Sequence, residues 1–183
     1  GILLYGMSLL YGATGTTSLA GIAAALDGQE TSAVLVLAVI LVAAGMGFKI
    51  AAVPFHMWAP DVYEGAPTPV TAFLSVGSKA ASFAMLLRIF VEGLPALGDE
   101  WRTMFWVLAA ITMTVGNIAA LTQSNIKRML AYSSIAHAGY LLIGLVVGTE
   151  RGVAAMLVYL GVYLFMQLGA FAIVTAMRRS DII

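Results

Sequence analysis

The sequence contains no cysteine among its 183 residues and only two histidines. The lack of cysteine excludes disulfides, CxxC redox sites and iron–sulfur clusters held by thiolates. Two isolated histidines, His56 and His137, are too few to build a metal site alone. The sequence therefore predicts no metal centre in this chain.

Charged side chains are also scarce. Asp, Glu, Lys and Arg make up 10% of the residues, whereas an ordinary soluble domain contains about 25%. Hydrophobic residues account for 61%, which indicates an integral membrane protein. The formal net charge is zero, so nothing in the composition suggests nucleic acid as a partner.

The first residues, GILLYGMSLLYG, contain neither an initiator methionine nor a basic targeting region. We interpret the chain as an internal fragment of a longer polypeptide. Its residues 1–183 are predicted to form one transmembrane domain fragment.

Apolar stretches of membrane-spanning length recur along the chain. About 20 helical residues are needed to cross roughly 30 Å of hydrocarbon. Six stretches meet this length, over residues 3–25, 33–58, 67–91, 103–123, 128–147 and 153–177. The fold class predicted from them is an all-α bundle of about six transmembrane helices.

The second stretch contains Pro54. Proline lacks a backbone donor and clashes with the preceding turn, so this helix is predicted to break between Ile50 and Pro54. A broken transmembrane helix is tolerated only where its loosened backbone is buried in protein or lines a wet cavity. The break is therefore predicted to accompany a functional polar site.

Two lysines lie inside these stretches, Lys49 in the second and Lys79 in the third. A lysine near the bilayer centre costs about 2.5 kcal/mol or more, and such residues usually mark a proton or ion path. Removal from water favours the neutral amine, so both lysines are predicted to be switchable proton sites. Permanent pairing with carboxylates is the alternative interpretation, although few carboxylates lie at this depth.

His137 and Gln167 fall near the centres of the fifth and sixth stretches, at the predicted depth of the two lysines. A layer of ionisable and hydrogen-bonding groups at the midplane is typical of a lateral proton relay. Hydrogen bonding between helices is the alternative role for both residues.

The connection after the second stretch, WAPDVYEGAPTP, contains Asp61 and Glu64. Its Trp58 and Tyr63 are predicted to lie in the interfacial aromatic belt. The two carboxylates are weaker candidates for the proton path, and solvated loop residues or a helix cap are the alternatives. Lysine and arginine at 127, 128, 178 and 179 predict that this side of the membrane is cytoplasmic.

Four segments carry a family resemblance: GFKIAAVPFHMWAPDVYEGAPTPVTAFL, SVGSKAASFAMLLR, GNIAALTQSNIKRMLAYSSIAHAGYLLIG and YLFMQLGAFAIVTAMRRSDI. Together they resemble subunit N, also called subunit 2, of proton-pumping NADH-quinone oxidoreductase, respiratory complex I. The first segment is similar to the wider family of antiporter-like subunits, which includes multisubunit sodium/proton antiporters. The lysine in SVGSKAA, where L and M type subunits usually have histidine, favours the N type.

This resemblance implies a subunit of fourteen transmembrane helices, of which these six look like the sixth to the eleventh. It implies that Lys49 is the proton-site lysine of the broken seventh helix, Lys79 the connecting lysine of the eighth, and His137 a histidine on the central hydrophilic axis. The family's partner glutamate in the fifth helix and its lysine in the broken twelfth helix fall outside this chain.

The function implied is proton translocation, coupled to electron transfer from NADH to quinone in other subunits. The resemblance implies a translocase subunit that holds no redox centre of its own, with NADH, flavin, iron–sulfur clusters and quinone bound elsewhere in the complex. The implied partners are other membrane-arm subunits and the lipid bilayer. The implied location is a bacterial plasma membrane, with an organelle inner membrane or thylakoid as the alternative.

Two other functions stay open from the residues. A subunit of a monovalent cation/proton antiporter shares the broken-helix motif, although the lysine in SVGSKAA argues against it. A scaffold subunit that transports nothing would use its lysines only for pairing.

Overall fold

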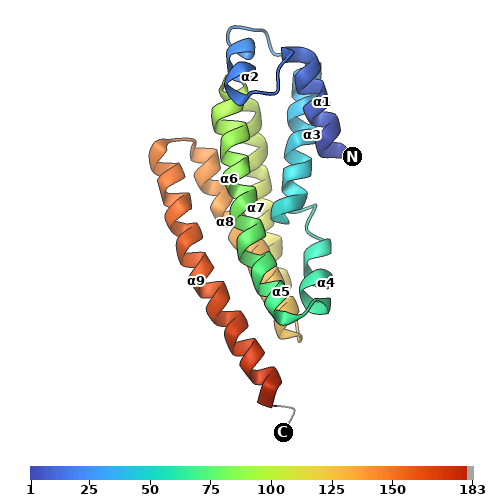
Figure 1. The fold of residues 1–183 in the computed structure, drawn as a ribbon, viewed down its shortest axis with the longest axis vertical. Coiled ribbons are helices and arrows are strands. Elements are labelled where there is room, and N and C mark those ends of the chain that lie inside the picture. The colour runs from blue at the N-terminus through green and yellow to red at the C-terminus, as the bar shows by residue number, and fades with distance from the viewer. Residues whose placement is uncertain (181–183) are drawn as a thin grey trace.

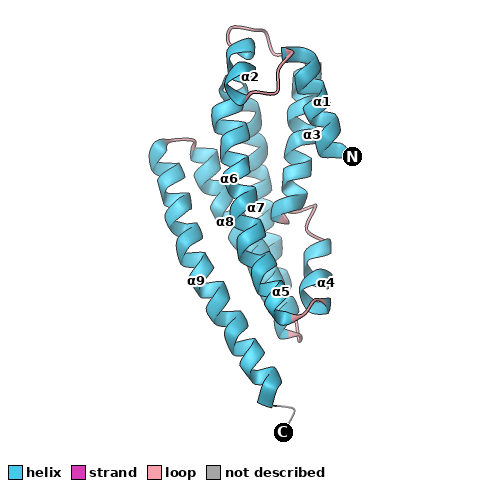
Figure 2. Ribbon diagram, viewed as in Figure 1, coloured by secondary structure: helices cyan, strands magenta, loops and turns pink. Residues whose placement is uncertain are grey.

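The computed structural model describes the backbone of residues 1–180 and the side chains of residues 1–177. This part of the chain is helical and contains no strand. Five helices are long and apolar enough to cross a membrane, or six if a bent pair at the N-terminal end is one span. The long helices run side by side in an elongated bundle (Figure 1 and Figure 2). The predicted all-α bundle of about six spans is confirmed.

The first stretch is interrupted, which the sequence analysis did not predict. Its helices α1 (Ile2–Thr14) and α2 (Leu19–Leu26) meet at an angle of 55°. Gly15 ends α1 in the left-handed conformation, with φ of 70°, as glycine commonly does at a helix end. Ser18 then caps α2 through a bond from the Gly21 N–H. The C-cap at Gly15 and the N-cap at Ser18 therefore divide this apolar run into two helices.

The predicted break near Pro54 is confirmed. Helix α3 (Ala33–Ile50) stops before the loop 51–57, and helix α4 (Trp58–Gly65) follows. The loop places the backbone N–H of Val53 3.0 Å from Thr112 Oγ1, and Trp58 Nε1 donates to the Phe48 carbonyl at 2.9 Å. The first bond satisfies a buried backbone N–H of the loop, as a low-dielectric setting requires. The second adds to the bond that the Phe48 carbonyl accepts from the Ala51 N–H.

The third span runs from Thr68 to Gly93 and contains four segments. These are α5 (Thr68–Phe73), the π-helical turn η1 (Leu74–Ser78), α6 (Lys79–Leu87) and the π-helical turn η2 (Arg88–Gly93). π-Turns are rare and frequent at functional sites, and η1 ends directly before Lys79. The predicted span 67–91 is close to the observed bounds, but the two π-turns were not predicted.

A short 3-10 turn, η3 (Pro95–Leu97), leads into α7 (Gly98–Leu121). Helices α8 (Ile126–Val147) and α9 (Glu150–Ser180) follow. Helix α7 begins before the predicted residue 103, because Asp99 and Glu100 occupy its first turn, where acidic side chains interact favourably with the helix dipole.

Helices α7 and α8 pack backbone to backbone. A Cβ added to Gly116 would lie 2.7 Å from the Ala136 nitrogen, and one added to Gly139 would lie 2.8 Å from the Met113 nitrogen. Small residues permit such close approach between transmembrane helices. The pair therefore forms a tightly fixed wall of the bundle.

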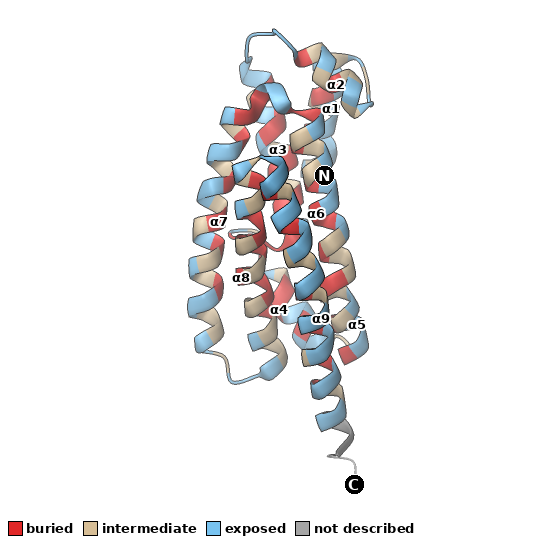
Figure 3. Cartoon of the chain, turned by 90° about the vertical axis from the view of Figure 1, so that its left-hand side faces the viewer, coloured by how far each residue is buried: buried red, intermediate tan, exposed pale blue. Residues whose placement is uncertain are grey.

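Buried residues lie mainly on the helix faces toward the middle of the bundle, and exposed residues lie mainly on the outer faces (Figure 3). Phe90, Trp101 and Phe105 form an edge-to-face aromatic cluster, with the Phe90 and Phe105 ring centroids 4.8 Å apart. The Trp101 N–H is satisfied by the Leu94 carbonyl at 2.9 Å. This apolar core holds the third span against α7 and leaves the polar groups to another part of the bundle.

Candidate functional site

The centre of the site is Lys79, whose residue surface is only 4% exposed. It begins α6, and its amine reaches across to α8. Nζ lies 2.5 Å from the Ser134 carbonyl oxygen and 2.6 Å from Ser134 Oγ. The aromatic ring of Tyr163 also lies under the amine, with its centroid 5.8 Å from Nζ. Three groups from two neighbouring helices thus surround one buried amine.

Tyrosine hydroxyls extend this contact on two sides. Tyr163 Oη of α9 donates to Ser134 Oγ at 2.8 Å, and Tyr63 Oη of α4 lies 3.4 Å from the same oxygen. Gln167, 2% exposed, donates from Nε2 to Tyr163 Oη at 2.7 Å. Ser134 is therefore the shared node of a buried polar cluster, which we call the Lys79 cluster and define as Tyr63, Lys79, Ser134, Tyr163 and Gln167.

Contacts with α8 and α9 offset part of the free-energy cost of burying the Lys79 amine. Removal of an ammonium from water costs several kcal/mol even after relaxation. Hydrogen bonds to a charged donor return about 1.5–3 kcal/mol each, and Lys79 makes two of them. A desolvated cation–π contact adds about 2 kcal/mol. These contacts therefore offset part of the cost of burying the charged amine.

His137 lies one helical turn after Ser134 on α8. Its Nδ1 is 2.5 Å from Tyr159 Oη on α9. Its ring centroid is 5.1 Å from that of Tyr163 and 5.6 Å from that of Tyr140. His137 thus borders the Lys79 cluster, and it bonds a neighbouring helix as the alternative interpretation expected.

Lys49 has a different setting. It occupies the last turn of α3, directly before the break, and its side chain is exposed on the surface of the described bundle. Among the described residues it makes no hydrogen bond or ion pair. The structure therefore brings together three of the four predicted midplane residues, Lys79, His137 and Gln167, and leaves Lys49 outside this group.

Asp61 and Glu64 form an ion-paired cluster with the start of α8. Arg128 Nη1 lies 2.7 Å from Asp61 Oδ1 and 2.9 Å from Glu64 Oε2. Lys127 Nζ donates to the Glu64 carbonyl at 2.8 Å, and Asn125 Nδ2 donates to Glu64 Oε1 at 3.1 Å. The carboxylates therefore clamp α4 to α8 instead of capping the next helix. The side chains of residues 178 and 179, on which the predicted orientation also rests, lie outside the described residues.

The prediction that Tyr63 belongs to an interfacial belt is wrong. Its side chain is 2% exposed and packs edge-on against Phe171, with centroids 6.4 Å apart. After the break, α4 packs against α8, so a residue that sequence order places in a surface loop is buried.

Sequence reasoning also missed Ser134, Tyr159 and Tyr163. Two signals could have found them. Ser134 precedes His137 by one turn, and Tyr159, Tyr163 and Gln167 recur every four residues, which places them along one face of a helix. The sequence therefore shows that these polar residues share a helix face, but not that this face points toward the lysine and the histidine.

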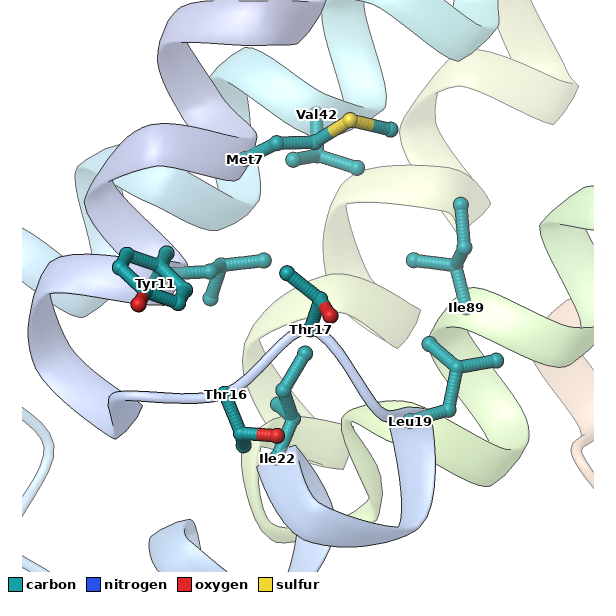
Figure 4. Close-up of a pocket in the computed structure, with 9 residues that line it drawn as sticks. Met7, Tyr11, Thr16, Thr17, Leu19, Ile22, Val42 and Ile89 are labelled. Atoms are coloured by element: carbon teal, nitrogen blue, oxygen red, sulfur yellow. The ribbon is translucent and has the colours of Figure 1, made fainter.

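In the part of the chain that the structure describes, no group of three or more His, Cys, Asp or Glu side chains could hold a metal ion. An apolar pocket of about 170 Å³ opens at the bend between α1 and α2. Figure 4 shows Met7, Tyr11, Leu19 and Ile89 around it. None of the predicted site residues lines this pocket, so it is separate from the Lys79 cluster.

A family model and a relative of known name both match this chain. The family model described as NADH:quinone oxidoreductase/Mrp antiporter, TM, matches residues 1–182. The chain is 54% identical over 183 residues to NADH-quinone oxidoreductase subunit N of Desulforamulus reducens, covering 98% of this chain and 38% of that protein. The chain thus spans little more than a third of the length of this relative.

Solved structures share the fold. A chain of respiratory complex I from Thermus thermophilus with bound aureothin gives a TM-score of 0.77 at 42% identity, covering 94% of this chain and 36% of that one. A chain of the Mrp complex from a Dietzia species gives 0.79 at 28% identity, covering 93% and 31%. The helical arrangement described above is therefore common to both kinds of complex.

Proposed function

Since this chain belongs to the NADH:quinone oxidoreductase/Mrp antiporter transmembrane family, we propose that it moves protons across a membrane as part of a larger complex. The observation that carries the proposal is the Lys79 cluster. A buried amine there shares one serine with two tyrosines and borders a histidine. Titratable groups in a membrane interior are functional by default because they are costly to keep there.

The complex that we propose is NADH-quinone oxidoreductase, with this chain in its membrane arm. Identity to the subunit N relative is 54%, whereas identity to the Mrp chain is 28%. Its partners would be the neighbouring membrane-arm subunits and the lipid bilayer. NADH, flavin, iron–sulfur clusters and quinone would be handled by other subunits, and this chain would contribute to the enzyme as a translocase subunit.

Ser134 allows Lys79 to exist in two protonation states. A protonated lysine donates three hydrogens and accepts none, so Ser134 Oγ accepts from it. After Lys79 loses its proton, the Ser134 hydroxyl can rotate and donate to the neutral amine, while it still accepts from Tyr163 Oη. The change of state requires rotation of one hydroxyl and no movement of a helix.

His137 would take the proton onward along the midplane. Its ring borders that of Tyr163, and Nδ1 contacts Tyr159 Oη. Histidine accepts a proton on one nitrogen and releases one from the other, so it can pass a proton between two sides of its ring. We propose His137 as the next proton acceptor after Lys79 and Ser134.

Lys49 would be the other end of this route. It stands at the helix break, where its amine has no counter-charge among the described residues. We propose that a carboxylate from a segment outside this chain completes its site. The bonds from Val53 to Thr112 and from Trp58 to Phe48 would hold the break open while that carboxylate moves.

The test is Lys79→Met in the intact complex, with Lys49→Met beside it. We expect each to abolish most proton translocation coupled to NADH oxidation while the complex assembles, because methionine keeps the chain length and removes the proton carrier. Arg88→Met is the control, since that exposed guanidinium pairs with Glu92 at the surface. Normal translocation by an assembled Lys79→Met complex would remove Lys79 from the path.

A second candidate is a subunit of a monovalent cation/proton antiporter. The Mrp chain has the same fold, with a TM-score of 0.79. Sodium-dependent proton movement without NADH or quinone turnover would favour this function. Absence of such movement in vesicles that pump protons with NADH would leave the first proposal.

A further inference from the structure

Arg102 carries a guanidinium that no described carboxylate neutralises. It lies in the second turn of α7, at the end of the bundle opposite the Arg128 ion pairs. Its Cζ is 5.3 Å from the centre of the Trp101 ring, and the Trp101 indole is itself fixed by its bond to the Leu94 carbonyl. No described residue accepts a hydrogen bond from Arg102. The five N–H donors of this group are therefore available to a ligand.

Gly148 also contacts the guanidinium. This glycine ends α8 in the left-handed conformation, with φ of 62°. A Cβ at this position would lie 2.8 Å from Arg102 Nη2 and 2.9 Å from Nε, so the guanidinium lies directly against the glycine. An arginine packed against both an aromatic ring and a glycine is restricted in orientation before a ligand arrives. This restriction lowers the entropic cost of binding.

A groove begins at Gly148, at the turn between α8 and α9. The turn lies toward the end of the bundle that holds α2 (Figure 1), and the groove has a volume of about 340 Å³. Its polar end is lined by Gly148, Thr149 and Glu150. Apolar side chains of η2 and the first turns of α9 line the rest: Val91, Val153, Ala154 and Leu157. Leu157 is 54% exposed, so the apolar part is open to the surroundings of the helices. A groove of this kind in a membrane protein matches an amphipathic ligand.

The polar end of the groove combines charges of both signs. Arg102 supplies a cation, and Glu150 supplies a carboxylate that makes no ion pair with any described residue. Arg151 is exposed beside it. A guanidinium binds phosphate oxygens through parallel N–H bonds, and basic pockets between transmembrane helices bind lipid head groups. The carboxylate would repel a purely anionic head group, whereas it attracts an ammonium.

From these observations we propose that the groove binds phosphatidylethanolamine from the bilayer. Arg102 donates to the lipid phosphate, and Glu150 accepts from the primary ammonium. One acyl chain lies along Val153 and Leu157, where its burial is favourable. This binding site goes beyond the proposed function and does not depend on proton movement at Lys79.

Photolabelling of the intact complex tests the site. The complex is reconstituted in phosphatidylglycerol vesicles that contain a small fraction of one photoreactive lipid, with a diazirine in an acyl chain and an ethanolamine, glycerol or choline head group. Labelled peptides are measured by mass spectrometry. We expect the ethanolamine lipid to label residues 153–157 more strongly than the other two, because only its ammonium can donate hydrogen bonds to Glu150.

Substitutions at the two charges separate their roles. Arg102→Gln should reduce labelling by the ethanolamine lipid about tenfold, because it removes a charge-assisted bond to phosphate. Glu150→Gln should lower labelling by the ethanolamine lipid but not by the glycerol lipid, so that the preference between them disappears. Arg88→Gln is the matched control, since that exposed arginine lies at the same end of the bundle and already pairs with Glu92.

A third variant leaves both charges in place. Ala154→Phe fills the apolar part of the groove, so it should abolish labelling of residues 153–157 in a complex that assembles normally by native electrophoresis. A wild-type complex in which these residues stay unlabelled would overturn the lipid site, because another segment or subunit would then cover the groove. Equal labelling by the three lipids, or labelling that Ala154→Phe or Arg102→Gln leaves unchanged, would also overturn it.

Discussion

The two lysines of this chain occupy opposite kinds of surroundings. Lys79 is buried, and every group that it contacts belongs to α8 or α9 of the same chain. Lys49 lies exposed beside a broken helix, and no described side chain bonds its amine. The groups described around the first amine belong to this chain, whereas the second amine has no described partner. On the proposed function, the first lysine would depend on this chain and the second on its neighbours.

The largest effect is expected at the node of the complete site. Ser134→Ala removes the oxygen that accepts from both Lys79 Nζ and Tyr163 Oη. Leaving buried donors unpaired costs about 1–3 kcal/mol each, so we expect the complex to dissociate at a lower temperature and translocation to fall at least about tenfold. Both are measurable on purified complex in vesicles. Ser133→Ala is the neighbouring control. Equal behaviour of the two variants would show that the Lys79 site does not depend on this serine.

A smaller effect is expected at the helix break beside Lys49. Thr112→Val removes the acceptor of the Val53 N–H, and Thr112 is itself 0% exposed. One unsatisfied buried N–H costs about 1–3 kcal/mol, so the thermal dissociation temperature should fall while Thr112→Ser keeps the bond and the stability. If valine and serine behave alike, the bond from Val53 to Thr112 does not hold the break.

The smallest effect is expected at the other side of the break. Trp58→Phe preserves an aromatic ring beside Phe48, 5.5 Å away between centroids, but removes the bond from Nε1 to the Phe48 carbonyl. A typical hydrogen bond contributes about 0.5–1.5 kcal/mol, and this one is exposed. We expect a slight loss of thermal stability, with Trp106→Phe as the exposed control. A loss greater than that of Thr112→Val would reverse the order proposed for the two bonds.

Much of the fold was readable from the sequence because membrane spans are set by length and apolar content. The break near Pro54 followed from the chemistry of proline. The interruption at Gly15 and Ser18 was missed because a long apolar run hid a stop signal and a start signal. The π-turn before Lys79 has no marker in residue type.

The candidate site was readable only in part. The depth of Lys79, His137 and Gln167 followed from the span boundaries, but depth does not fix the direction in which a side chain points. Ser134 and Tyr163 depend on how α8 and α9 are rotated about their axes, and serine and tyrosine are too common in membrane helices to stand out. The exposure of Lys49 depends on which neighbours cover α3. Whether these residues carry protons stays a prediction.

The close backbone packing of α7 against α8 has a mechanical consequence. At Gly116 and Gly139 even one extra methyl group has no room, so α8 can neither slide nor roll against its neighbour without a collision. Helix α8, which bears Ser134 and His137, is therefore fixed in position against α7. On the proposed function, a signal from the rest of the complex would act on Lys79, Ser134 and His137 by reorienting hydrogens, waters and charges. A bulky residue at Gly116 should displace α8 and disrupt this site.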